Sequence, residues 1–245
     1  MIADMHNFLP LASEGCFVMA AQRAVIFVNG VLDEASRAAL TARLQPDDWL
    51  VAVDGGLRHA RALGRAPHVL IGDLDSVTET DIEWVSAAGG RVLRYPPEKD
   101  ETDLELALDL ARAEGYRTIL LAGALGGRVD HLLGNLSLLA HPALEGLDVR
   151  IIQPDGEIFL IRGEREIEGR AGNVISLLPL FGVARGVRTQ GLQYPLRDED
   201  LLPYRTRGIS NVMLGSRAAV SLESGLLLCV HLDSEGAGLR ARLPQ

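Results

Sequence analysis

The sequence is poor in several residue types, and each shortage excludes a class of protein. Its 245 residues include only two cysteines, Cys16 and Cys229, far apart and without a CxxC pair, which favours a reducing cytoplasm over a disulfide framework. The net charge of -9 disfavours a nucleic-acid binder, because such proteins need clustered Lys and Arg. No apolar run approaches the roughly 18 residues that a membrane helix requires. We therefore expect a soluble, cytoplasmic chain without nucleic-acid or membrane partners.

What is present is a chain long enough to fold into one or two domains. Charged residues make up 23% of it and no low-complexity tract occurs, which excludes a disordered protein. The first stretch carries Asp4 and no cation near its start, unlike a secretory signal. We expect residues 1–23 and 234–245 to be poorly ordered extensions.

From Arg23 onward, short aliphatic runs alternate with longer amphipathic segments. The runs predict strands within 24–30, 49–56, 68–76, 91–96 and 118–127, and the segments predict helices within 33–44, 57–64, 78–90, 100–115 and 129–140. Strands that alternate with helices of this length form a parallel sheet covered on both faces. We therefore predict an α/β domain over 24–153, with a doubly wound, mostly parallel sheet.

The helical period disappears after residues 148–156. Short apolar runs separated by Gly, Pro and Asn predict further strands within 157–164, 173–183, 217–224 and 225–233. The last two meet at Glu223-Ser224-Gly225, which is typical of a hairpin. We expect a smaller all-β, sandwich-like domain over 154–233.

Aspartates and glycines follow four consecutive predicted strands, within 54–56, 72–76, 99–103 and 123–131. In an open parallel sheet, ligands bind where the carboxyl ends of the strands converge. Six aspartates are therefore expected along one edge of the sheet: Asp54, Asp73, Asp75, Asp100, Asp103 and Asp130.

These carboxylates need a partner of opposite charge. Two of them about 4 Å apart repel by roughly 4 kcal/mol at an effective dielectric constant near 20. Lys99 and Arg128 compensate this charge only in part. Carboxylates are preferred ligands of Mg²⁺, and the nearby glycines let backbone N–H groups approach a phosphate. The pattern predicts a metal-assisted phosphoryl-type site.

Each motif also has a purely structural interpretation. Asp100 with Asp103 has the spacing of a helix cap and a first-turn acid, Asp130 could cap the next helix, and the glycine pairs could serve turns alone. The conjunction of four such strand ends favours function. The sequence lacks the phosphate loop GxxxxGK[ST], HExxH, GxSxG and a GxGxxG after the first strand, so a less common nucleotide or phosphoester site remains.

The ordered motifs VDGG (53–56), IGDLDS (71–76), KDETD (99–103), GALGGRVDHLLGNL (123–136), GLQYPL (191–196) and GISN (208–211) closely resemble those of bacterial thiamine pyrophosphokinases. The resemblance covers roughly residues 24–232. It implies an α/β domain joined to a β-sandwich domain, in a homodimer. It also implies transfer of a pyrophosphoryl group from ATP to the hydroxyethyl oxygen of thiamine, giving thiamine diphosphate and AMP.

The resemblance further implies roles for individual residues. Mg²⁺ and the polyphosphate would be held by Asp73, Asp75, Asp100 and Asp103, with Arg128 meeting the developing charge. The ATP site would be lined by Asp54, Gly55, Gly56, Ser76, Thr102, Gly127, Asp130, His131 and Asn135. Ser210 and Asn211 would reach thiamine from the β domain, across the dimer interface. Animal members of the family have a stacking tryptophan in the last strand, where this chain has Leu226–Val230, and we expect Tyr194 to be a core residue.

Two other functions fit the same residues. The acceptor could be another hydroxymethyl compound, such as a pterin alcohol, because related pyrophosphokinases share carboxylate-rich α/β sites. Alternatively, the chain could be a non-catalytic sensor of nucleotide or thiamine that retains the pocket.

Overall fold

The computed structural model describes residues 23–233. The predicted extensions therefore lie outside the described residues, except for Arg23, which begins the first strand. None of the helices within 23–233 combines the length and hydropathy of a bilayer span.

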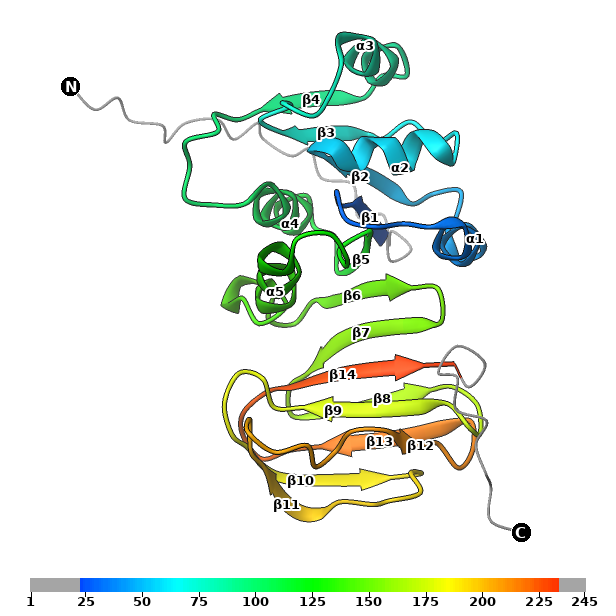
Figure 1. Ribbon diagram of the computed structural model, residues 1–245, viewed down its shortest axis with the longest axis vertical. Helices are drawn as coiled ribbons and strands as arrows, with labels where there is room; N and C mark the ends of the chain where they lie inside the picture. Colours follow the sequence, from blue (N-terminus) through cyan, green and yellow to red (C-terminus); the bar gives the residue numbers. More distant parts are fainter. Residues whose placement is uncertain (1–22, 234–245) are drawn as a thin grey trace, which may run out of the picture.

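The first half of the chain forms the predicted α/β arrangement, a parallel sheet with helices on both faces (Figure 1). Its strands, in the spatial order β6-β5-β1-β2-β3-β4, are β1 (Arg23–Phe27), β2 (Trp49–Val53), β3 (Val69–Gly72), β4 (Arg91–Arg94), β5 (Thr118–Ala122) and β6 (Asp148–Gln153). Its helices are α1 (Glu34–Arg43), α2 (Leu57–Ala62), α3 (Glu79–Ala87), α4 (Asp103–Ala113) and α5 (Val129–Leu138), with short 3-10 helices η1 (Asp54–Gly56) and η2 (Pro142–Leu144).

The central strands are apolar throughout because both of their faces are covered. Val25 and Phe27 of β1 pack with Leu40 of α1 on one face. Ala24 and Ile26 pack on the other face, in the cluster that contains α4. The alternation of strands and helices thus places all five strand-to-helix loops at the carboxyl edge of the sheet.

The second half extends the same sheet and adds another. β7 (Gly156–Ile161), β14 (Leu227–Leu232), β9 (Val174–Leu178) and β12 (Asn211–Val212) continue the first sheet in that order, with antiparallel pairing, to a total of ten strands. β11 (Arg197–Leu201), β10 (Ala184–Gln190), β13 (Arg217–Ser221) and β8 (Glu164–Glu168) form a four-stranded sheet, and an apolar core joins the two sheets. The predicted fold class, an α/β sheet followed by a smaller β-sandwich, is confirmed.

The predicted hairpin at 223–225 is wrong. β13 pairs with β8 and β10, whereas β14 pairs with β7 and β9, so this turn crosses from one sheet to the other. Val220 and Cys229 lie in the same core between the sheets. In a sequence, two apolar runs joined by a turn show the same pattern whether the two strands pair within one sheet or lie in two sheets that face each other. The charged strands β8, β10 and β11 and the two-residue β12 were missed because their alternation of buried and exposed residues is weak in sequence.

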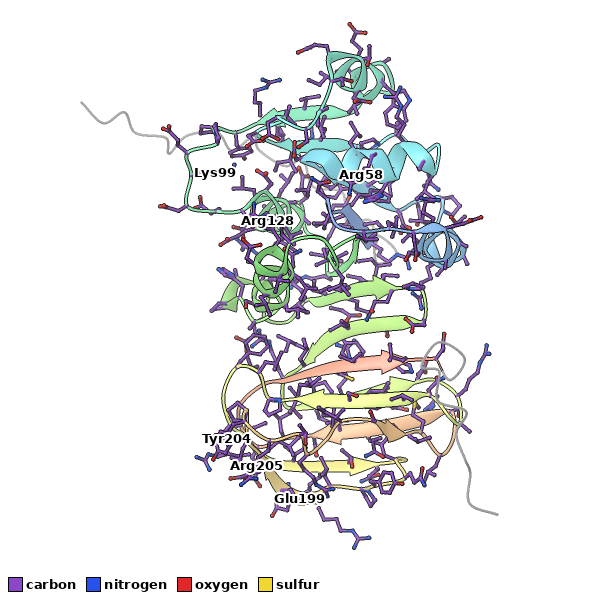
Figure 2. All side chains as sticks on the ribbon, in the orientation of Figure 1. Arg58, Lys99, Arg128, Glu199, Tyr204 and Arg205 are labelled. Atoms are coloured by element: carbon purple, nitrogen blue, oxygen red, sulfur yellow. The ribbon has the colours of Figure 1, made fainter. Side chains whose placement is uncertain are left out.

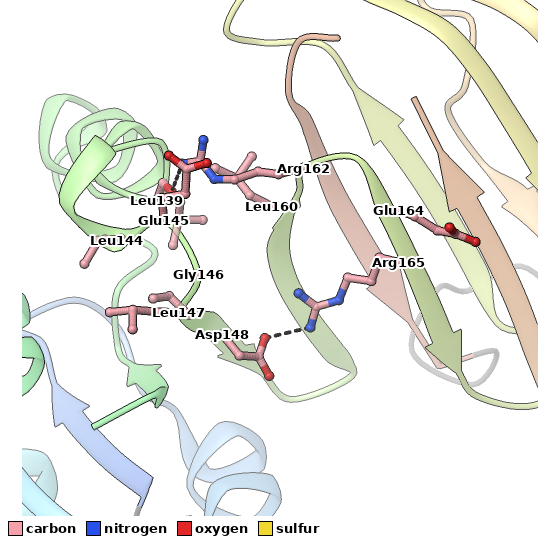
Figure 3. A pocket seen from close by; sticks show the side chains of 11 residues that line it. Leu139, Leu144, Glu145, Gly146, Leu147, Asp148, Leu160, Arg162, Glu164 and Arg165 are labelled. Atoms are coloured by element: carbon pink, nitrogen blue, oxygen red, sulfur yellow. Dashed lines mark hydrogen bonds and ion pairs between the residues drawn. The ribbon is translucent and has the colours of Figure 1, made fainter. Parts of the chain in front are cut away.

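A network of ion pairs fills the junction between the two halves. Asp148 of β6 accepts hydrogen bonds from Arg150 and, across the junction, from Arg165 of β8 at 2.6 Å (Figure 3). Both guanidinium groups lie against the buried ring of Phe159. A cavity of about 530 Å³ beside Asp148 lies between the amino end of β6, the end of β7 and the start of β8. It contains none of the strand-end aspartates, so we assign it to the packing of the two halves.

Candidate active site

Three of the predicted aspartates converge at the carboxyl ends of β2 and β3. Asp54 begins η1, and Asp73 and Asp75 lie in the loop between β3 and α3. One carboxylate oxygen from each lies within 4.8 Å of the others, and the residues range from buried Asp54 to exposed Asp75. Oxygens this close can contact a single divalent cation together.

The loops that present these carboxylates are held in strained conformations. Asp54 has φ 43° and Leu74, between the other two aspartates, has φ 64°, both in the left-handed region that non-glycine residues rarely occupy. Such strain costs about 1–3 kcal/mol per residue and persists only where the surroundings enforce it. Here the two left-handed residues are Asp54 itself and the residue between Asp73 and Asp75.

Asp103 joins this group at Gly72, the last residue of β3. A Cβ atom on Gly72 would lie 3.1 Å from Cβ of Asp54 and 3.4 Å from Cγ of Asp103, so these two side chains flank the same point. Lys99 Nζ is 3.0 Å from Asp103 Oδ1 but does not form an aligned hydrogen bond with it. Among the described residues, Asp54 Oδ1 and Asp103 Oδ1 are the buried side-chain polar atoms without a hydrogen-bond partner.

These two oxygens provide a test of whether the site fits a divalent cation. A buried carboxylate oxygen without a hydrogen-bond partner costs about 1–3 kcal/mol or more unless a ligand satisfies it. Both unsatisfied atoms lie at the acidic cluster, and the donor set consists of carboxylates, which hard cations prefer. The residues therefore fit Mg²⁺.

The other two aspartates do not join the cluster. Asp100 is exposed in the loop before α4. Asp130 is exposed in α5 and accepts hydrogen bonds from Arg128, at 2.6 and 3.1 Å, which lower its pKa to about 2. The capping interpretation of both is wrong, because Thr102 caps α4 and α5 has no side-chain cap.

The glycines of the VDGG motif permit close backbone approach. A Cβ on Gly56 would lie 2.1 Å from the carbonyl oxygen of Phe27, and one on Gly55 would collide with the Asn29 side chain. The loop after β1 is thus pressed against η1. Sequence reasoning missed this fifth strand end, although Asn29, two residues after the end of β1, offered the same signal as the others.

Two residues of α2 secure the loop after β1. Arg58 donates hydrogen bonds to Asn29 Oδ1 and to the carbonyl oxygens of Asn29 and Gly30. His59 Nε2 lies 3.0 Å from the Gly30 carbonyl oxygen, and its burial lowers its pKa, so the neutral imidazole donates there. The Gly30 amide in turn donates to Gly123 in the loop after β5. Three of the strand-end loops are therefore fixed relative to one another.

The remaining predicted residues of the α/β half lie on the same loops. Ser76 Oγ donates to Asp75 Oδ1 at 2.8 Å, and Asn135 Nδ2 donates to the carbonyl of Ala124, which anchors α5 to the loop after β5. Gly127 and His131 are exposed at the start of α5.

The β half contains a second concave region, lined by Tyr194, Arg207, Ile209 and Asn211, of about 380 Å³. Asn211 is buried, accepts a hydrogen bond from the Tyr194 amide and donates to its carbonyl. The neighbouring Ser210 is exposed and has φ 57°. The expectation that Tyr194 belongs to the core is wrong, because it is 57% exposed: Asn211 holds its backbone, and the ring projects outward.

The two regions lie in different halves of the chain. The loops after β2 and β3 are in the upper half of Figure 1 and β12 is in the lower half. Lys99 and Arg128 likewise lie above Tyr204 and Arg205 in Figure 2. The aspartate cluster can bind a divalent cation, which in turn can orient a polyphosphate. The β region offers an exposed aromatic side chain and a cavity.

Comparisons with known proteins agree with this division. Residues 40–151 match the family "Thiamin pyrophosphokinase, catalytic domain", and residues 161–227 match "Thiamin pyrophosphokinase, vitamin B1 binding domain". A thiamine pyrophosphokinase of Bacillus subtilis is 32% identical over 183 residues, which are 74% of this chain and 86% of that protein.

Solved structures give the same result. The thiamine pyrophosphokinase structure from Bacillus subtilis has a TM-score of 0.76 and 29% identity, covering 86% of this chain and 99% of that one. The thiamin pyrophosphokinase structure from Geobacillus thermodenitrificans has a TM-score of 0.73 and 26% identity, covering 86% and 98%.

Proposed function

The chain belongs to the thiamine pyrophosphokinase family, and from this premise we propose that it transfers a pyrophosphoryl group from ATP to thiamine. The products are thiamine diphosphate and AMP. The observation that carries the proposal is the acidic cluster of Asp54, Asp73 and Asp75 beside Asp103, formed by motifs that occur in the family's order. A pterin acceptor and a non-catalytic sensor are not favoured, because both halves match thiamine pyrophosphokinase families. The cysteine content favours a cytoplasmic enzyme.

We assign the cation site to Asp73, Asp75 and Asp103. Asp54 is the buried member of the site, and Asp100 lies on the loop between β4 and α4. Mg²⁺ bound there would neutralise polyphosphate charge that the protein's cations cannot balance. Gly55 and Gly56 let the loop after β1 lie against η1, and we assign the nucleotide to the edge that these two packed loops form. Thr102, Ser76, Gly127, His131 and Asn135 line the ATP side of the same loops.

The reaction forms a bond from the thiamine hydroxyl oxygen to the β-phosphorus of ATP, and the bond from that phosphorus to the α–β bridging oxygen breaks. An aspartate, either Asp73 or Asp100, accepts or steers the hydroxyl proton. Arg128 first leaves Asp130 and contacts the substrate. There it balances the negative charge that develops on the transferred group. Fixed loops hold the reactants in line, so positioning and electrostatics supply most of the catalysis.

We assign ATP and cation binding to residues 24–153, and thiamine binding and dimerisation to residues 154–233. Ser210, Asn211 and Tyr194 form the thiamine side of the site, because Tyr194 is the exposed aromatic residue that Asn211 anchors. The last strand, β14, offers no exposed aromatic side chain for thiamine, and its residues Leu227, Leu228 and Cys229 are buried.

A homodimer would bring the two regions together in one site. The helices cover the ten-stranded sheet only over its α/β half (Figure 1). Beyond them, the same face carries partly exposed apolar residues: Leu160, Leu178, Phe181 and Val230, with Leu180 and Ile209 nearby. An apolar sheet face of this kind favours a second copy of the chain as its cover.

Product stoichiometry tests the proposed function. The protein is incubated with Mg²⁺, ATP and thiamine, and AMP and thiamine diphosphate are quantified by chromatography. We expect equal amounts of the two products and no AMP release above background when thiamine is omitted. AMP without thiamine diphosphate, or preference for a pterin alcohol, would contradict the proposal.

A further inference from the structure

Lys99 is unusual in both sequence and structure. It is the only lysine among the 24 Lys and Arg residues of the chain; every other one is arginine. Its side chain is only 13% exposed, in the loop between β4 and α4 (Figure 2). Its ammonium group lies 3.0 Å from Asp103 Oδ1 and donates to the Pro96 carbonyl oxygen at 3.1 Å. The single lysine is thus placed against the acidic cluster.

The contact between Lys99 and Asp103 differs from the arginine pairs of this protein. Arg207 holds Glu199 through two hydrogen bonds of 2.9 Å, and Arg23 holds Asp48 through two of 2.8 Å. A guanidinium fork fixes its carboxylate, whereas an ammonium on a flexible stem is a compact charge that can leave. Because Asp103 Oδ1 forms no aligned hydrogen bond, the lysine compensates its charge without satisfying it.

We propose that Lys99 is an internal counter-ion, which takes the cation's place beside Asp103 while no divalent ion is bound and leaves when one binds. An ammonium group suits this exchange because, like the incoming ion, it is a compact charge with no fixed bonding plane. Compensation by Lys99 keeps the acidic cluster folded in the free enzyme. The displaced ammonium then becomes available to the polyphosphate. The inference rests on the proposed function only in taking the acidic cluster as a divalent-cation site.

Binding of Mn²⁺ to the nucleotide-free protein tests the competition directly. We expect Lys99→Met to bind Mn²⁺ about five- to tenfold more tightly than the wild type in calorimetry or electron paramagnetic resonance, because a competing charge has been removed. Lys99→Arg keeps the charge and adds a guanidinium fork that can fix its carboxylate, so we expect it to bind Mn²⁺ no more tightly than the wild type. Equal or weaker binding by Lys99→Met, or no binding by either protein, would overturn the proposal.

The unique lysine allows a second test on the wild-type chain. Acetylation of Lys99 is followed by mass spectrometry, with the chain's α-amino group as the internal reference. We expect Mg²⁺ alone to accelerate labelling of Lys99 several-fold, and Asp103→Asn to show rapid labelling without Mg²⁺. Asp109→Asn, an exposed change on the same helix, should behave like the wild type. Labelling that Mg²⁺ leaves unchanged would contradict the exchange, and neither readout depends on thiamine diphosphate formation.

Discussion

The two unsatisfied oxygens, on Asp54 and Asp103, show how single residues prepare this site for a ligand. Burying a carboxylate oxygen without a hydrogen-bond partner destabilises the free protein, and the left-handed backbone at Asp54 and Leu74 adds to that cost. Neither feature improves packing. Both are explained if the stabilisation is recovered when a cation and polyphosphate bind.

Replacement of Asp75 tests whether this side chain serves cation binding and not the stability of the fold. The side chain is exposed, so Asp75→Asn should leave the unfolding midpoint almost unchanged. Turnover should fall by roughly 100-fold or more, because one charge is removed from the cluster that balances the polyphosphate. Steady-state formation of thiamine diphosphate and urea unfolding measure the two effects. Near-normal turnover would exclude Asp75 from the cation site.

Tyr194 and Tyr204 form a matched pair for testing the thiamine region. Both are exposed tyrosines of the β half, but only Tyr194 is anchored by Asn211 beside the cavity. We expect Tyr194→Ala to raise KM for thiamine about tenfold, since an aromatic face stabilises a cationic ring, and to leave KM for ATP unchanged. Tyr194→Phe and Tyr204→Ala should resemble the wild type. The assignment fails if both alanine variants behave alike.

At the scale of elements, the site depends on how closely β3 approaches η1 and α4. Gly72 ends β3 with φ 147°, and its missing side chain leaves room for Asp54 and Asp103. Parallel pairing aligns the ends of β2 and β3, and Thr102 fixes the start of α4. The position of each carboxylate is therefore a consequence of where its element begins or ends.

A pair of glycine substitutions tests this dependence. Gly64→Ala changes a residue at φ 63° with no atom within 4 Å of the added Cβ, so it should cost about 1 kcal/mol of stability and retain activity. Gly72→Ala places its Cβ against two carboxylates and should reduce Mn²⁺ binding and turnover more than tenfold. Calorimetry and steady-state assays distinguish the two variants. Similar activity losses in both would indicate backbone strain as the cause.

The whole molecule places the aspartate cluster and the cavity beside Tyr194 toward opposite ends of one continuous sheet. Ten strands run from β4 in the α/β half to β12 in the β half, so the halves cannot fold onto each other without breaking strand pairing. Ion pairs around Asp148 stiffen the junction further. This separation supports our proposal that a second chain completes the site.

Mixing two impaired variants, assayed at a thiamine concentration well below the wild-type KM, tests the shared site. Asp75→Asn impairs the cation region, and Tyr194→Ala combined with Ser210→Ala impairs the thiamine region. Refolding the two proteins together should restore about a quarter of wild-type activity, because about half of the dimers are mixed and each contains one intact site. Each variant refolded alone serves as the control. No recovery would place both regions of a site in one chain.

Stability should fall on mild acidification. Burial lowers the pKa of His59 and of His231, so the folded protein keeps both neutral while the unfolded chain takes up protons near pH 6.5. Because the unfolded state then binds more protons, stability is present above about pH 6.5 and is lost as pH falls below it. Urea unfolding at about pH 7.5 and about pH 5.8 measures the loss. His231→Gln should reduce this pH dependence, and an unchanged dependence would contradict the assignment.

The sequence by itself determined the order of the α/β elements and the residues that gather at their carboxyl ends. Alternating aliphatic runs and amphipathic helices leave few arrangements besides a parallel sheet, and parallel strands place Asp54, Asp73, Asp75 and Asp103 on one edge. Local signals were sufficient because each strand and its following loop are adjacent in the chain.

Only the tertiary structure decided which residues of those loops meet. Asp100 is not among the grouped carboxylates, Asp130 pairs with Arg128, and Lys99 contacts Asp103. These outcomes depend on where helices begin and side chains turn. The exposure of Tyr194 and the passage of residues 223–225 between sheets depend on partners distant in sequence. Such contacts leave no periodic signal in the chain, because they are set by packing between elements and not by the pattern within one.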